Sequence, residues 1–188
     1  MTQTFRFLCL AASLGLGCGS GVSSDEQARL AYFGLDASVD KAIQLGFDGF
    51  NAASSANIPP QMTTGVTAGT LKVTGQVDQG ASANKGMRLF EELVAYSDDG
   101  KLVYNTSASA LPALNMQLKG IPTGTMTGTL VGTVGMTGDL TGDVTLNLSF
   151  TSTLQAGTGT AVTRKPGTTV ITGTAISAGG TYQVNVTR

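Results

Sequence analysis

The chain has no histidine and no tryptophan, and only 12% of its residues are charged. Histidine is the most common general base in enzymes and a common ligand of zinc. Its absence excludes a Ser–His or Cys–His nucleophile pair and a histidine-bound metal ion. The neighbouring carboxylates Glu91 and Glu92 would point to opposite faces of a strand, so they cannot work together as acid and base. We therefore expect a protein that is not an enzyme and needs no cofactor.

An excess of either charge is also missing, since 11 Lys and Arg residues stand against 12 Asp and Glu residues. Without a basic patch, the sequence does not favour nucleic-acid binding.

Cysteine is scarce as well, because Cys9 and Cys18 are the only two in the chain. They supply neither a disulfide framework nor a cysteine zinc site. The fold must then depend on its hydrophobic core, and the chain is long enough for one ordinary domain.

The first 18 residues, MTQTFRFLCLAASLGLGC, combine one positive charge at Arg6, an apolar run over residues 7–16 and small residues up to Cys18. This is the layout of a secretory signal peptide, and it is too short to span a membrane, which takes about 20 apolar residues. The ending LGLGC resembles the lipobox of bacterial lipoproteins, with glycine where leucine is expected three residues before the cysteine. The resemblance implies that residues 1–17 are removed and that Cys18 carries acyl chains. An ordinary cleaved signal peptide and an uncleaved core helix are the alternatives.

Acylation of Cys18 would make the membrane a partner of this protein and place it in the bacterial cell envelope. Several acyl chains hold a protein on a bilayer almost irreversibly, because each buried CH₂ group contributes about 0.8 kcal/mol. In enterobacterial lipoproteins an aspartate after the cysteine retains the protein at the inner membrane, and here that residue is Gly19. We therefore expect the outer membrane. Residues 18–24 are expected to be the lipidated cysteine and a flexible tether, and residues 25–188 a single domain.

The beginning of the domain has the pattern of helices. Ser24 with Gln27 three residues later forms a capping box, which predicts the start of a helix. Apolar residues recur at helical spacing over residues 38–50, which predicts an amphipathic helix, and Gly34 is expected to break the helical segment before it. The apolar residues at this spacing are Val39, Ile43, Phe47 and Phe50.

From Thr63 onward threonine, glycine, valine and leucine dominate, which is typical of strands. Residues 114–150 alternate, with apolar residues or glycine at even positions and mostly polar residues at odd positions. This stretch is too long for one strand, so it must fold back on itself. The apolar residues stay at even positions along the whole stretch. We therefore predict turns with an odd number of residues near residues 120–122 and 135–138.

A curved sheet packed on the N-terminal helix accounts for these patterns. The segment over residues 87–96 fits a helix or a strand, and the turn sequence DDG soon after it favours a strand. At the C-terminus, a two-residue turn at Gly179 and Gly180 would pair Ala175 with Val184. Glycine recurs among the apolar positions of the sheet, and we expect it to leave room for the helix. The predicted fold is mainly β with an N-terminal α-helix, in which six to eight strands form a curved antiparallel meander or a partly closed barrel.

Four threonines mark a candidate binding surface on the polar side of the sheet: Thr123, Thr125, Thr127 and Thr129. Their spacing resembles the threonine ladders of ice-binding β-solenoids, although no fixed coil length repeats along this chain. The simpler interpretation is a solvated strand face of β-branched residues. Asp139 and Asp143 are interpreted as residues of turns and edges, because the sequence around them matches no calcium loop.

These observations favour a non-enzymatic envelope lipoprotein with a structural or binding role. A carrier of an apolar ligand or a lipid, with a cavity between helix and sheet, is the first alternative. At the level of architecture alone, such a protein resembles the periplasmic carriers of lipoproteins and lipids. Surface adhesion or ice binding through the threonine face is the second alternative.

Overall fold

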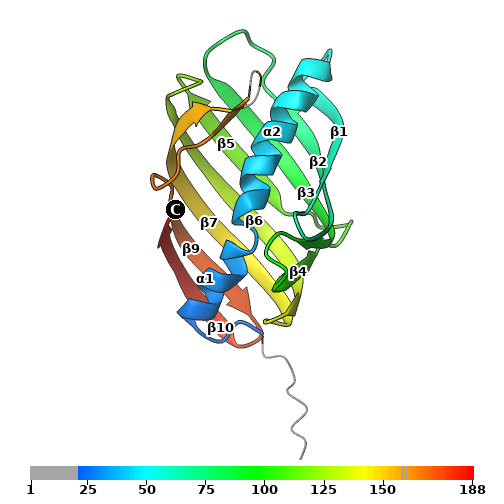
Figure 1. Ribbon diagram of the computed structural model, residues 1–188, viewed down its shortest axis with the longest axis vertical. Coiled ribbons are helices and arrows are strands. Elements are labelled where there is room, and N and C mark those ends of the chain that lie inside the picture. Colours follow the sequence, from blue (N-terminus) through cyan, green and yellow to red (C-terminus); the bar gives the residue numbers. More distant parts are fainter. Residues whose placement is uncertain (1–20, 158, 160) are drawn as a thin grey trace, which may run out of the picture.

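The computed structural model describes residues 21–157, 159 and 161–188. Two consecutive helices lie along the concave side of a curved antiparallel sheet (Figure 1). This is the mainly β architecture with an N-terminal helical segment that the alternation of apolar residues predicts. The hydrophobic core lies between the helical layer and the sheet. None of the described helices is long and apolar enough to cross a membrane.

The helices begin and break where the sequence indicates. Helix α1 spans Asp25–Phe33 and helix α2 spans Asp36–Ala52, with Gly34 between them. The side-chain oxygen of Ser24 accepts a hydrogen bond of 3.2 Å from the backbone N–H of Gln27, which satisfies one free donor of the first turn. The N-cap at Ser24 is therefore confirmed, but the side chain of Gln27 accepts from the backbone N–H of Ser23 and does not complete the capping box with Ser24. Helix α2 is longer at both ends than the apolar periodicity alone predicts.

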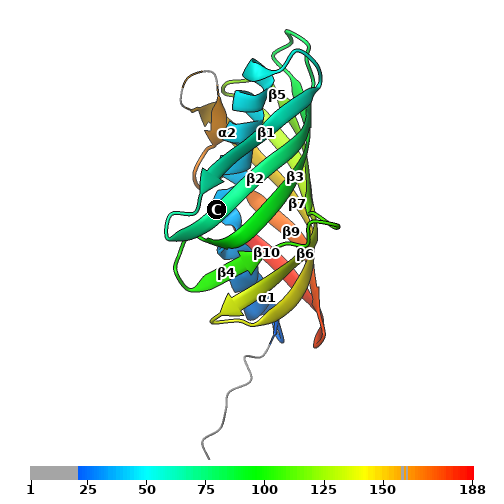
Figure 2. The ribbon, with the colours of Figure 1, turned by 90° about the vertical axis from the view of Figure 1, so that its right-hand side faces the viewer.

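The sheet contains ten antiparallel strands, more than the six to eight that we expect from the sequence. They are β1 (Asn57–Thr64), β2 (Ala68–Val77), β3 (Lys85–Ser97), β4 (Leu102–Asn105), β5 (Ala113–Lys119), β6 (Thr125–Gly138), β7 (Gly142–Ala156), β8 (Val162–Arg164), β9 (Val170–Ser177) and β10 (Gly180–Thr187). Neighbouring strands follow the order β1-β2-β3-β4-β6-β7-β9-β10, while β5 pairs with β3 and β6, and β8 pairs with β7. The sheet therefore curves into a partial ring, with the helices on its inner side (Figure 2).

The preserved parity along residues 114–150 is confirmed. Lys119 pairs with Thr125 across a five-residue loop, and Met136 pairs with Gly142 across another. The second turn comes later than we expect, because β6 continues through Gly138, where it pairs with β4. Within residues 114–150, the even-numbered apolar residues of β5, β6 and β7 lie on the concave face, where they are buried: Leu114, Met116, Leu118, Met126, Leu130, Val134, Met136, Val144, Leu146, Leu148 and Phe150.

The C-terminal hairpin has a two-residue turn, but the predicted register is wrong by two residues. Ser177 pairs with Gly180, so Ala175 lies opposite Tyr182 and not opposite Val184. The hydroxyl of Tyr182 donates a hydrogen bond of 2.8 Å to a carbonyl oxygen of the turn, which stabilises this register. Because the error is an even number, both apolar rows still lie on the concave face.

Two glycines of α2 lie close against side chains of the sheet. A Cβ atom on Gly46 would lie 3.1 Å from the sulfur of Met87, and one on Gly49 would lie 2.8 Å from Cβ of Ile58. The prediction that the sheet glycines receive the helix is corrected, because the space beside Gly128 is filled by the neighbouring strands. The atoms nearest to a Cβ at Gly128 belong to Asn115, Met116 and Phe150.

Candidate functional site

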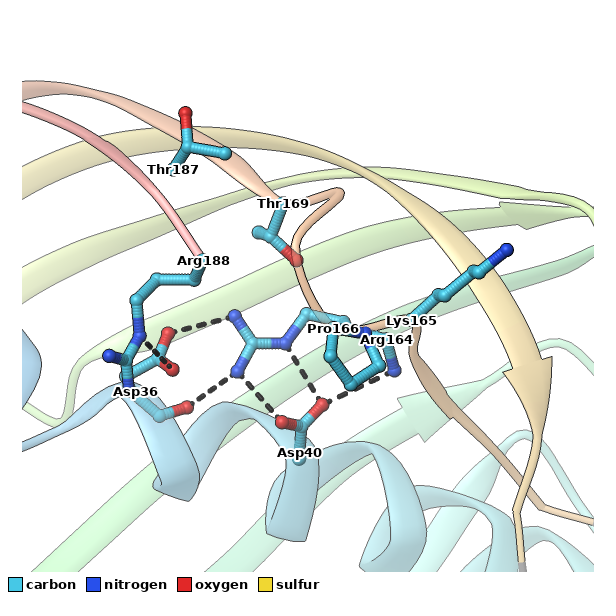
Figure 3. A pocket seen from close by; sticks show the side chains of 8 residues that line it. All are labelled: Asp36, Asp40, Arg164, Lys165, Pro166, Thr169, Thr187 and Arg188. Atoms are coloured by element: carbon cyan, nitrogen blue, oxygen red, sulfur yellow. Dashed lines mark hydrogen bonds and ion pairs between the residues drawn. The ribbon is translucent and has the colours of Figure 1, made fainter.

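The densest group of charges lies where the beginning of α2 meets β8 (Figure 3). Asp36 and Asp40 are one helical turn apart and therefore share a face of α2. Arg164 donates to the carboxylate of Asp40 at 2.9 and 2.8 Å, and to the carboxylate and carbonyl oxygens of Asp36 at 2.9 and 2.7 Å. Arg188 donates to the other carboxylate oxygen of Asp36 at 3.2 Å. We call these four residues the ion-pair cluster.

The charges of the cluster stabilise one another. Burial alone would raise the pKa of Asp36, but attraction to Arg164 and hydrogen bonds from Tyr32, Arg164 and Arg188 outweigh it, so the pKa lies below its usual value. Burial alone would lower the pKa of Arg164, but hydrogen bonds and attraction to Asp40 and Asp36 raise it overall. Asp36 and Arg164 are therefore both charged at neutral pH, and the cluster joins α2 to β8.

The cluster borders an open hollow of about 380 Å³ that is lined by Asp36, Asp40, Arg164, Lys165, Pro166, Thr169, Thr187 and Arg188. Four of the five N–H groups of Arg164 already donate to protein oxygens. The guanidinium of Arg188 lies 5.0 Å from the centre of the Phe33 ring, and Lys165 points away from the carboxylates (Figure 3). The ion-pair cluster therefore holds the helix and the sheet together. It contains neither a free base nor an activated nucleophile.

A second polar group, Glu91, is buried between β3 and the helices. Its side chain is 2% exposed, and its Oε1 atom has no hydrogen-bond partner among the described residues. Burial raises the pKa of Glu91 to about 7, and the side chain of Ser38 on α2 only partly offsets this effect. Glu92 lies on the opposite face and pairs with Lys72, as expected for adjacent residues of a strand. Glu91 is therefore a titratable group without access to a substrate.

The candidate threonines are only partly brought together. Thr125, Thr127 and Thr129 lie in a row on the convex face of β6, whereas Thr123 lies in the loop before the strand. A shallow hollow of about 410 Å³ runs over this face and is lined by Asn115, Met116, Gln117, Thr127, Gly128, Thr129, Ser149, Phe150 and Thr151. Asp143 is exposed and has the same parity as the polar residues of β7, so a charge lies at the end of this face. The sheet beneath the row is curved (Figure 2).

Cys18, the candidate lipidation site, lies outside the described residues. The described chain begins at Gly21, and Val22 is already 1% exposed and part of the core. The hydroxyl of Ser177 donates a hydrogen bond of 2.5 Å to the carbonyl oxygen of Val22. The expected tether over residues 18–24 therefore includes residues that contact the domain.

Sequence reasoning missed the ion-pair cluster and the burial of Glu91. Arg164 and Asp36 are 128 positions apart, and no local pattern links them. The burial of Glu91 was detectable in the sequence, because Glu91 stands between Leu89 and Leu93 in a row of alternate residues that is otherwise apolar. Among the described residues, no group of three or more acidic, histidine or cysteine side chains is placed to hold a metal ion.

The comparisons with known proteins identify no relative. No family model matches the chain, no curated protein is similar to it, and no solved structure shares its fold at a significant level. Inferences about function therefore rest on the residues and their geometry alone.

Proposed function

We propose that this chain is a non-enzymatic lipoprotein of the bacterial cell envelope, anchored in the outer membrane by acyl chains on Cys18. Its domain has a structural or binding role there. The observation that supports the proposal best is the spacing between the lipobox-like LGLGC and Val22, the first core residue in the part of the chain that the structure describes. Only three residues separate Cys18 from Val22. Cys18 therefore precedes, in the sequence, the residues that pack in the described core.

The proposal predicts a clean difference between the two cysteines. Cys18→Ser should abolish acylation, whereas Cys9→Ser should leave it intact because Cys9 leaves with the signal peptide. We would express each full-length chain in a Gram-negative host and measure the intact mass and the membrane-bound fraction. The wild-type and Cys9→Ser proteins should begin at residue 18, carry the mass of acyl chains and remain with the membranes. A wild-type protein without acyl mass in the soluble fraction would contradict the proposal.

A carrier of apolar ligands is less well supported by the geometry. Beneath α2 the concave face is filled by side chains of the helix and the sheet, and Phe47, Ile43 and Leu89 are each at most 3% exposed. A carrier would therefore have to move α2 away from the sheet before it could take up a ligand. Titration with an apolar fluorophore such as 1-anilinonaphthalene-8-sulfonate tests this alternative, since tight stoichiometric binding to the native protein would favour it.

Adhesion to ice through the threonine face has an observation against it. A flat, regular array is needed to match ordered water, and the face that carries Thr125, Thr127 and Thr129 belongs to a curved sheet (Figure 2). The hydroxyls of these residues have no protein partner within the described part of the chain, so they are open to water. The face is therefore better suited to solvation or to a polar partner than to a crystal surface.

A further inference from the structure

We infer that one end of the molecule, which we call the near end, lies against the lipid bilayer while the opposite, far end points away from it. The near end comprises the start of α1 at Asp25, the β3–β4 turn at residues 98–101, the β6–β7 turn at residues 139–141 and the β9–β10 turn at residues 178–179. The far end comprises the β2–β3 loop at residues 78–84 and the β5–β6 loop at residues 120–124. The inference rests on the proposed acylation of Cys18, and its partner is the surface of a phospholipid membrane.

The described chain starts between two turns of the near end. A Cβ atom on Gly21 would lie 3.4 Å from the carbonyl oxygen of Thr141 in the β6–β7 turn. Val22 is buried, and its carbonyl oxygen accepts the hydrogen bond from Ser177 beside the β9–β10 turn. The first described residues are therefore fixed at this end of the molecule (Figure 1).

The chain from this point to the anchor is too short to span the domain. Cys18 is three residues before Gly21. Three extended residues span at most about 11 Å. Strand β6 runs from the far loop to the near turn through 14 residues, and a strand of that length extends over about 45 Å. An anchor on Cys18 therefore holds the near end within reach of the headgroups, and it cannot bring the far end there unless the molecule lies flat.

The charges of the near end do not supply an attraction of their own. Asp99, Lys101 and Asp139 line a hollow of about 330 Å³ beside α1. Glu26 pairs with Arg29 on α1, and the carboxylate of Asp25 accepts a hydrogen bond of 2.8 Å from the backbone N–H of Gln183. Since the carboxylates of this end outnumber its cations, anionic lipids would not draw it to the surface. The acyl chains must therefore supply the binding, and the protein without them should not bind.

A matched pair of labelled variants tests the orientation. Ala178→Cys places a thiol in the near β9–β10 turn, and Ala81→Cys places one in the far β2–β3 loop, where both alanines are exposed. The mature chain has no other free thiol if Cys18 is acylated, so each variant takes a single fluorophore. The acylated proteins are inserted into vesicles of phosphatidylethanolamine and phosphatidylglycerol that contain a headgroup-labelled nitroxide lipid. Quenching of the two fluorophores is then compared, and the controls are forms of both variants that begin at residue 19 and therefore lack the signal peptide, Cys9 and Cys18.

We expect at least threefold stronger quenching at position 178 than at position 81, and no quenching in the forms that begin at residue 19. Equal quenching at the two positions in acylated protein would mean that the molecule lies flat, and stronger quenching at position 81 would mean that it is inverted. Either result would overturn the orientation while leaving the anchor intact. Absence of acyl mass on Cys18 would overturn the anchor and the orientation together, so the two failures are distinguishable.

Discussion

The two faces of the sheet carry side chains of the same kinds in different surroundings. On the concave face Glu91 is buried without a counter-charge, and Arg164 from the adjoining β8 is enclosed by two carboxylates. On the convex face Glu92 pairs with Lys72, and Arg88 is half exposed beside Asp78. Water competes for every interaction on the convex face, so each contributes little, whereas on the concave face a broken interaction leaves a group without a partner. Matched substitutions on the two faces can therefore measure what burial adds.

The largest effect is expected from the aromatic residues. Phe47 on α2 is 3% exposed in the core, whereas Phe90 on the convex face of β3 is 45% exposed. Phe47→Ala should lower the free energy of unfolding by about 3–5 kcal/mol, because it removes a buried ring and leaves a cavity. Phe90→Ala should cost less than about 1 kcal/mol. Urea unfolding followed by circular dichroism would measure both, and equal losses would show that the helix does not depend on Phe47.

The arginines provide the second pair. Arg164→Met leaves the carboxylate of Asp36 buried with fewer partners, and we expect a loss of about 3–5 kcal/mol in the free energy of unfolding. Arg88→Met removes an exposed ion pair and should change the stability by less than about 1 kcal/mol. Thermal unfolding at low and high salt distinguishes them further, since screening weakens only the exposed pair. Equal losses in the two variants would mean that the ion-pair cluster does not hold α2 to β8.

The features that the sequence predicts well are those that depend on neighbours in the chain. The parity of residues 114–150 requires only that one face of the sheet be buried, so it survives the misplaced turn near residue 137. The strand over residues 87–96 was predictable because the turn sequence that follows it favours a hairpin, and it is confirmed as part of β3. The register of the C-terminal hairpin is different, because it depends on a hydrogen bond from Tyr182 that the residue types do not specify.

The features that the sequence does not predict depend on contacts between distant segments. The glycines that allow the helix to approach the sheet lie in α2 itself, where their spacing looks like part of an ordinary amphipathic pattern. The strand β8 has only three residues, which is too short for a periodic signal. Its Arg164 therefore resembles any surface charge until the fold places it beside Asp36 and Asp40.

Glu91 and Glu92 form the third pair, and their difference should depend on pH. Burial raises the pKa of Glu91 to about 7, so between about pH 4.5 and 7 the folded protein holds a proton that the unfolded chain has released. Stability from this group is complete below about pH 4.5 and is lost as the pH rises through 7, by about 3 kcal/mol in total. Glu91→Gln should remove this loss, whereas Glu92→Gln should retain it. Urea unfolding at intervals from pH 5 to 8 measures the slope, and a wild-type slope in the Glu91→Gln protein would contradict the assignment.

The smallest effect concerns the space around Gly128 on β6. Valine is the better strand former, so propensity alone predicts that Gly128→Val stabilises the sheet. Packing predicts the opposite, because a Cβ atom there would lie 2.7 Å from the backbone oxygen of Asn115 and 3.1 Å from side-chain atoms of Met116 and Phe150. We expect overpacking to dominate and to lower the free energy of unfolding by about 1–3 kcal/mol. Thr129→Val on the convex face of the same strand is the matched control and should change stability by less than about 0.5 kcal/mol. If Gly128→Val proved as stable as its parent, the neighbouring strands would have to move apart at this position, and the glycine would not be needed for their close packing.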